Sequence, residues 1–366
     1  MKRSSLCLFV AVLLLAASPS RASDTVFAFV GPLSGSAAGY GTMSLVGVQQ
    51  SVDDLNQSGG LGEQRIVLKT FDDACDPKQA VAVANRIVAQ EIHFVIQGSC
   101  SGSSIAPLKV FTENNVVVIN PIATNPKLTD EGGPSIFRAT YRDDVAAGTI
   151  AQGIAKKFPG KKLAIINDGS SYGADIAQQV TKRLNTAGIK EVLSDTYDPA
   201  NRDFSALITH LKEMGVEVLF VGGYPVEIGT IARQLHDAGV TIQLVAGDLT
   251  DNDFWKIAGP AGEGALSIFP PDPLKHKGAA ALRAAYERRK QDYNGLSLYS
   301  YAATQVMAEA IKITSIDPTK GTAGAIHEGN FDTILGKWRF DDKGDIQGIP
   351  LVFYRWHEGK LEELAG

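Results

Sequence analysis

Residues 72–88 read DDACDPKQAVAVANRIV and say more about the fold than any other stretch of the chain. Asp76 is placed to cap a helix, Pro77 suits the first helical position, and Gln79 lies where a capping box needs it. Small and apolar residues then follow at the spacing of one buried helix face: Ala80, Val83, Ala84, Ile87 and Val88. The stretch predicts the end of a strand, a turn that carries Cys75, and a helix packed against a sheet.

On both sides of this stretch, short apolar runs alternate with helical patterns. Helical stripes include Ile176, Val180 and Leu184. The runs that we predict as strands are residues 26–30, 66–71, 94–97, 116–120, 163–166, 192–197, 216–221 and 242–246. Such alternation is typical of parallel, doubly wound sheets, so we expect an α/β fold.

The last third of the chain breaks this rhythm. We predict helices over residues 279–293 and 298–314, followed by strands over 337–340 and 351–357. Turn-like segments at 141–143, 270–273 and 348–350 suggest three places where the chain crosses between two lobes. The predicted division is a signal peptide over 1–22, one lobe over 23–142 plus 272–350, and a second over 143–271 plus 351–366. A length near 340 residues after processing suits two domains.

The first residues have the pattern of a secretory signal. Lys2 and Arg3 precede an apolar run at 6–17, and Ala22 follows as a small residue at a cleavage point. The run is too short for a membrane span, which needs roughly 20 residues. We therefore expect a soluble, exported protein cleaved near Ala22.

The charge of the chain is acidic. Its 366 residues contain 35 basic and 40 acidic side chains, and residues 1–22 hold three of the basic ones and none of the acidic ones, so the mature formal charge is −8. This balance argues against nucleic acid as a partner, because affinity for phosphates depends on Lys and Arg. It argues equally against an anionic membrane surface.

Two cysteines remain after removal of the signal, Cys75 and Cys100. In an oxidising compartment they are expected to form a disulfide, which would close a loop of about 25 residues. A pair of free, buried thiols is the alternative.

Polar side chains follow several of the predicted strands. In open parallel sheets, ligands bind beyond the carboxyl ends of the strands. Ser101 and Thr124 can offer hydroxyl and backbone donors to an anion, whereas Asp248 can pair with an ammonium. Each of these residues alone is as readily explained by helix capping. Together they describe a site for a zwitterion.

At these residues the chain resembles the periplasmic branched-chain amino acid binding proteins of ABC transporters, the Leu/Ile/Val type. The resemblance spans the mature chain. Its motifs are the 72–88 run with Cys75 and Cys100, GPLSG at 31–35, PIATNP at 121–126, GGY at 222–224, YSYAA at 299–303 and FDDKGD at 340–345. It implies a type I venus-flytrap fold with a three-segment hinge, a periplasmic location, and delivery of an amino acid to an inner-membrane permease.

The resemblance also implies a role for individual residues. Ser101 and Thr124 would hold the ligand carboxylate, while the Ile122 carbonyl and the Thr124 hydroxyl would accept from its ammonium. Three tyrosines would line the site, and a fourth matches a wall position in some relatives: Tyr40, Tyr172, Tyr224 and Tyr299. Two departures concern selectivity. Asp248 stands where well-known leucine-type members have Glu, and Ser99 is small where relatives often carry a bulkier side chain.

Other functions fit the sequence less well. The GSCSG motif at 98–102 resembles a nucleophile elbow, but an oxidised Cys100 would be no nucleophile. The histidines lack metal-ligand spacing, so we expect no enzyme, no cofactor and no metal. A sensory module, or the same fold binding γ-aminobutyrate, proline or alanine, is the alternative. A fused sensor would need a downstream membrane segment, and none follows before Gly366. We expect a monomer.

Overall fold

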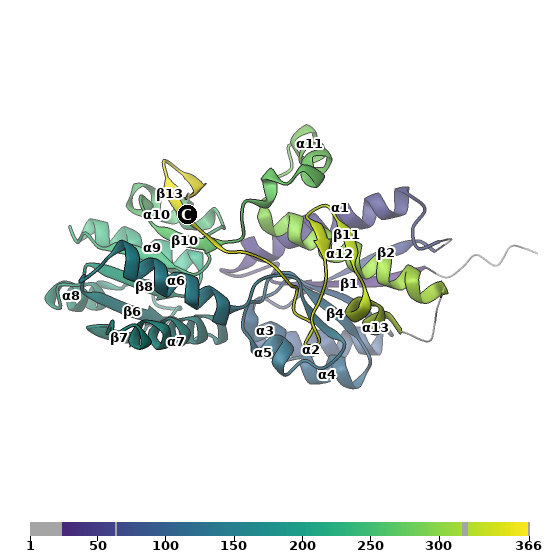
Figure 1. The fold of residues 1–366 in the computed structure, drawn as a ribbon, viewed down its shortest axis with the longest axis horizontal. Coiled ribbons are helices and arrows are strands. Elements are labelled where there is room, and N and C mark those ends of the chain that lie inside the picture. Colours follow the sequence, from purple (N-terminus) through teal and green to yellow (C-terminus); the bar gives the residue numbers. More distant parts are fainter. Residues whose placement is uncertain (1–23, 63, 317–320, 365–366) are drawn as a thin grey trace, which may run out of the picture.

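The computed structural model describes residues 24–62, 64–316 and 321–364, so the predicted signal peptide lies outside the described residues. Within this part of the chain the elements gather around two sheets that form the centres of two lobes (Figure 1). The first lobe is the sheet of β1 to β5 with its helices, and the second lobe is the sheet of β6 to β10 with its helices.

Both sheets have the same parallel strand order. The first, as described, runs β2 (Ile66–Asp72), β1 (Thr25–Gly31), β3 (Phe94–Gln97), β4 (Val117–Asn120), β5 (Ile136–Arg138). The second runs β7 (Leu193–Thr196), β6 (Leu163–Asn167), β8 (Val218–Gly222), β9 (Gln243–Ala246), β10 (Leu266–Phe269). Counted along the chain, each order is 2-1-3-4-5, the doubly wound arrangement in which a ligand crevice opens beside the first strand.

The second sheet continues into an antiparallel hairpin. Strand β13 (Val352–His357) pairs with β10, and β14 (Lys360–Glu363) pairs with β13. A small ribbon of β11 (Phe331–Thr333) and β12 (Gly336–Trp338) lies apart from both sheets. The strands predicted over 337–340 and 351–357 correspond to β12 and β13, whereas their antiparallel pairing and the strands β11 and β14 are additions to the predicted fold.

Helices cover the faces of both sheets. The first lobe carries α1 (Ala38–Gln57), α2 (Pro77–Ala89), α3 (Ser101–Ile105), α4 (Leu108–Glu113), α5 (Lys127–Asp130), α11 (Ala280–Arg289), α12 (Gly295–Ile316) and α13 (Gly321–Glu328). The second carries α6 (Asp143–Lys157), α7 (Ser171–Thr186), α8 (Ser205–Glu213), α9 (Pro225–Asp237) and α10 (Asp253–Ala258). In the described ranges, no helix combines the length and the apolarity that a bilayer span requires.

The chain passes between the two sheets three times, after β5, after β10 and after β12 (Figure 1). The first and third passages lie side by side, because Arg138 donates its backbone N–H to the Gly344 carbonyl and accepts from the Ile346 N–H. The predicted lobe boundaries leave each sheet intact within one lobe. The residues at which the lobes divide stay a prediction.

Most predicted elements are present, with ends that differ by a few residues. The eight predicted strands correspond to β1 to β4 and β6 to β9, each within two residues at either end. Strand β5 was missed because it is only three residues long. The predicted helix over 279–293 is too long. Helix α11 ends at Arg289, and Lys290 adopts a left-handed φ of 53° that stops it.

The stretch at 72–88 folds largely as its sequence indicates. Strand β2 ends at Asp72, and α2 begins at Pro77 with the Asp76 carboxylate accepting from the Gln79 N–H at 2.7 Å. The predicted capping box is modified. The Gln79 side chain donates to the Asp72 carbonyl rather than returning to a donor at the cap.

The disulfide between Cys75 and Cys100 is formed. It joins the turn before α2 to the residue before α3, across a sequence separation of 25 residues. The bridge therefore ties the 72–88 stretch to the loop that presents Ser101.

Replacing both cysteines by alanine should lower the free energy of unfolding by about 3 kcal/mol, because the unfolded chain loses a cross-link over this loop. Urea unfolding of the oxidised mature protein and of the double alanine variant measures the difference. Titration of two free thiols in the native protein would contradict the bridge.

Candidate ligand-binding site

A narrow cavity lies between the two lobes, at the carboxyl ends of strands from both sheets. Residues of the first lobe and of its exit segment form one side: Tyr40, Cys100, Ser101, Ile122, Ala123, Thr124 and Tyr141. Residues of the second lobe form the other: Tyr172, Tyr224 and Asp248. Both sheets thus point their ligand-binding edges at the same space, as their strand order predicts.

Seven of the nine predicted ligand residues line this cavity: Tyr40, Ser101, Ile122, Thr124, Tyr172, Tyr224 and Asp248. Ser99 and Tyr299 do not. The Ser99 hydroxyl is fully buried and donates to Asp73, beneath the loop rather than in the cavity wall. Contact of the lining residues with a ligand stays a prediction.

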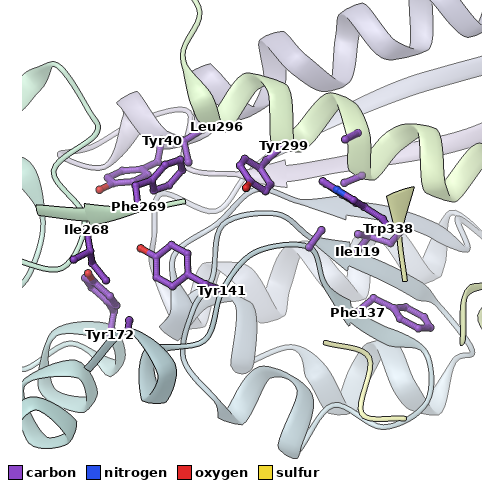
Figure 2. Packing of buried hydrophobic residues seen from close by; sticks show 14 of the residues in the cluster. Tyr40, Ile119, Phe137, Tyr141, Tyr172, Ile268, Phe269, Leu296, Tyr299 and Trp338 are labelled. Carbon is purple, nitrogen blue, oxygen red and sulfur yellow. The ribbon is translucent and has the colours of Figure 1, made fainter. Parts of the chain in front are cut away.

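Tyr299 lies one layer behind the cavity. Its ring stacks on Trp338 at 5.8 Å and meets the edge of Phe269 at 6.0 Å. Phe269 in turn contacts Tyr141, whose ring lies nearer the cavity, among those of Tyr40 and Tyr172 (Figure 2). Tyr141, and not Tyr299, therefore lines the cavity in this structure.

Tyr141 is a lining residue that the sequence alone did not reveal. The sequence predicts this residue only as part of a chain crossing at 141–143. It follows the short strand β5, so a search of the carboxyl ends of strands would have found it had that strand been recognised. Cys100 was likewise expected as scaffold, yet it also forms part of the wall.

The loop that carries Ile122 and Thr124 is shaped by a side chain at the end of β4. The Asn120 side-chain Oδ1 accepts the backbone N–H groups of Ile122 and Ala123, at 2.9 and 2.7 Å. Its amide donates to the Ser104 hydroxyl of α3 at 2.9 Å. One buried amide thus sets the turn after β4 and ties it to the helix that starts at Ser101.

Arg138 supports the same loop from below. Its guanidinium is fully buried and donates to the carbonyl oxygens of Asn125 and Ala123, at 2.7 and 3.4 Å. Its Nε donates to the Asp345 carboxylate at 2.7 Å. Asp345 also accepts from Arg142, so the loop after β4 and two of the three chain passages meet at one ion network.

Asp248 provides the negative charge of the cavity. Its carboxylate accepts the Thr250 N–H at 2.7 Å, and burial raises its pKa to about 6. The Asp248 backbone N–H donates to the Tyr172 hydroxyl at 3.2 Å. The hydroxyl proton of Tyr172 is therefore free to donate to another acceptor in the cavity.

The lobes are closed on the cavity. The Asn125 amide of the first lobe donates to the Ser171 carbonyl of the second at 2.7 Å. Tyr40 and Tyr224 meet edge to face across the cleft at 6.2 Å, and Tyr224 also contacts Tyr172 at 5.5 Å. A ligand here would be enclosed by both lobes at once.

Two doubly wound lobes, three chain passages and a cavity between the lobes that carries hydroxyl groups and one carboxylate define the class of two-lobed ligand-binding proteins. The chain belongs to the periplasmic binding protein family, whose model matches residues 26–360.

Relatives and solved structures agree with this assignment. The chain is 37% identical over 330 residues to the Leu/Ile/Val-binding protein homolog 1 of Brucella suis, covering 90% of this chain and 89% of that protein. It is 35% identical to the Leu/Ile/Val-binding protein BraC3 of Rhizobium johnstonii, covering 95% of each. Among solved structures, a leucine binding protein LivK from Thermotoga maritima has the same fold, with a TM-score of 0.84 at 22% identity over 93% of this chain and 98% of that one.

Removal of the buried Arg138 charge should be strongly destabilising. We expect Arg138→Met to lower the free energy of unfolding by about 3–5 kcal/mol, because Asp345 loses a buried partner. The paired variant Arg138→Met/Asp345→Leu should recover part of this loss. Urea unfolding measures both, with Arg355→Met as a control for a half-exposed arginine. Equal losses for Arg138→Met and the control would contradict a central role for the network.

Proposed function

We propose that this chain is the periplasmic substrate-binding component of an ABC transporter, and that it binds a branched-chain amino acid between its lobes. The observation that carries the proposal is the distribution of polar groups in the cavity. Hydroxyl donors stand on the first lobe, at Ser101 and Thr124, and the carboxylate of Asp248 stands on the second. A small zwitterion matches both.

The names of the relatives support the ligand class. The Brucella and Rhizobium relatives are Leu/Ile/Val-binding proteins by name. A branched-chain amino acid transporter substrate-binding protein LivJ of Streptococcus pneumoniae shares the fold, with a TM-score of 0.81 at 23% identity over 93% of this chain and 99% of that one, and its structure holds isoleucine.

The cavity offers both donors and acceptors. The Ser101 hydroxyl accepts the Asn125 N–H at 3.4 Å, so its own proton is free for the carboxylate of the ligand. Asp248 and the Ile122 carbonyl would take the ammonium, and the tyrosine rings would enclose an aliphatic side chain. Buried charges need such partners, because water is excluded from the closed cleft.

Binding would shift the lobes from open to closed, since only the closed form brings both walls to the ligand. The closed form would then be recognised by an inner-membrane permease. Export through a signal peptide cleaved near Ala22 and a monomeric state complete the proposal.

A thermal-shift screen of the mature protein against the standard amino acids and γ-aminobutyrate tests this function. We expect Leu, Ile and Val to raise the melting temperature most, because ligands that bind only the folded state stabilise it. Stabilisation by proline, alanine or γ-aminobutyrate alone would support the proposed binding mode but contradict a branched-chain amino acid as the ligand. No stabilisation by any of them would contradict the proposal.

Asp248→Asn should weaken binding of the best amino acid at least about 100-fold, because the enclosed ammonium loses its charge partner. Isothermal titration calorimetry at pH 7 measures the affinity. Asp253→Asn makes the same change at a carboxylate outside the cavity, paired with Lys256, and should leave affinity unchanged. Equal affinity for Asp248→Asn and wild type would remove Asp248 from the site.

A further inference from the structure

A second carboxylate, that of Asp143, lies buried behind the cavity wall. Asp143 is the first residue of α6, at the end of the first passage between the lobes. Its side chain is fully buried, and neither carboxylate oxygen makes a hydrogen bond of good geometry within the described part of the chain, although the Thr124 side chain lies close enough to favour the ionised form. Its backbone N–H donates to the Thr124 carbonyl at 2.9 Å, so it is fixed against a residue that lines the cavity.

Several elements around Asp143 contribute polar or charged groups. Burial raises its pKa to about 8, and Asp175 of α7 and Asp144 of its own helix act in the same direction. Arg138 of β5 and the side chain of Thr124 favour the ionised form. The negative charge of Asp143 in turn helps burial to raise the pKa of three tyrosines in the cavity wall: Tyr141, Tyr172 and Tyr224.

Arg138 does not satisfy this carboxylate. The hydrogen bonds of its guanidinium go to Asp345, to Thr129 and to backbone carbonyl oxygens. A buried carboxylate without a partner keeps its proton or requires a nearby cation. In the proposed binding mode, the ammonium of the ligand would be that cation, because it would bind on the cavity side of Thr124.

We propose that Asp143 is a positioning residue for that ammonium. In the ligand-free protein its carboxyl proton points to the Thr124 oxygen. When the ligand binds, Asp143 releases this proton to solvent and accepts the Thr124 hydroxyl proton instead, which leaves the Thr124 oxygen to accept from the ammonium. The inference rests on the proposed amino acid binding and deepens it, since it names a residue outside the cavity that tunes the ammonium subsite.

Proton release on binding tests the inference. Calorimetric titration of the best amino acid at pH 7, in buffers with different ionisation enthalpies, gives the number of protons released per ligand. We expect about one for wild type, because a group with a pKa near 8 is mostly protonated at pH 7 and ionises on binding. Ligand binding to Asp143→Asn should release about a tenth of a proton. This is about the fraction of Asp248 that is protonated at pH 7, because its pKa is about 6. The Asp143→Asn variant should also bind more weakly, by about 10-fold.

Asp253→Asn is the control. It makes the same change at a carboxylate that pairs with Lys256 outside the cavity and that is not among the groups acting on Asp143, so wild-type proton release is expected. Wild-type release in Asp143→Asn, or no release in wild type that binds the amino acid, would overturn the inference. Absence of amino acid binding by wild type would overturn the proposed function first.

A measurement on unaltered protein covers the case in which Asp143→Asn does not fold. In wild-type protein labelled with ¹³C at aspartate carboxyl groups, Asp143 should titrate above pH 7 without ligand and below pH 7 with it, separately from Asp248, whose pKa is about 6. A spectrum in which no aspartate titrates above pH 7 without ligand would also overturn the inference.

Discussion

The ion pair between the buried Arg138 guanidinium and Asp345 holds the ligand loop and the hinge together. The guanidinium lies at the end of β5, where the chain leaves the first lobe, and it binds the carbonyl oxygens of the loop after β4. Its partner Asp345 comes from the last passage between the lobes. A buried ion pair is costly to desolvate and is weak evidence for stability by itself. Here it fixes the loop after β4 relative to the first and third passages between the lobes. The same contacts therefore position both the cavity wall and the hinge.

The repeated strand order explains where the cavity lies. Each sheet opens its crevice at the carboxyl ends beside its first strand, and the passages between the lobes turn these two edges toward each other. The loops after β1, β3 and β4 then face the loops after β6, β8 and β9. The same 2-1-3-4-5 strand order in both lobes therefore produces one site, whose two walls differ in the side chains that each lobe contributes.

Much of this could be predicted because the informative residues sit next to long, regular elements. Ser101, Thr124 and Asp248 follow strands that the apolar pattern identifies, so their convergence needed only the rule for parallel sheets. Tyr141 and Asp143 follow a strand of three residues, which is too short for a periodic pattern. Ser99 lies in the loop after β3 but not in the cavity wall, because its hydroxyl donates to the buried Asp73 carboxylate beneath the loop. An apolar pattern in the sequence does not indicate the direction of such a side chain.

The two walls of the cavity also suggest why closure can discriminate among ligands. In the proposed binding mode the ligand carboxylate would contact the Ser101 hydroxyl of the first lobe, whereas the ammonium would contact Asp248 of the second lobe together with Ile122 and Thr124 of the first. A molecule with only a carboxylate would leave Asp248 unpaired, and a molecule with only an ammonium would leave the Ser101 hydroxyl unpaired. A ligand that carries both charges at amino acid spacing would therefore gain the most from the closed form. Since a ligand shifts an equilibrium by its difference in affinity for the two states, lobe closure itself becomes selective for zwitterions.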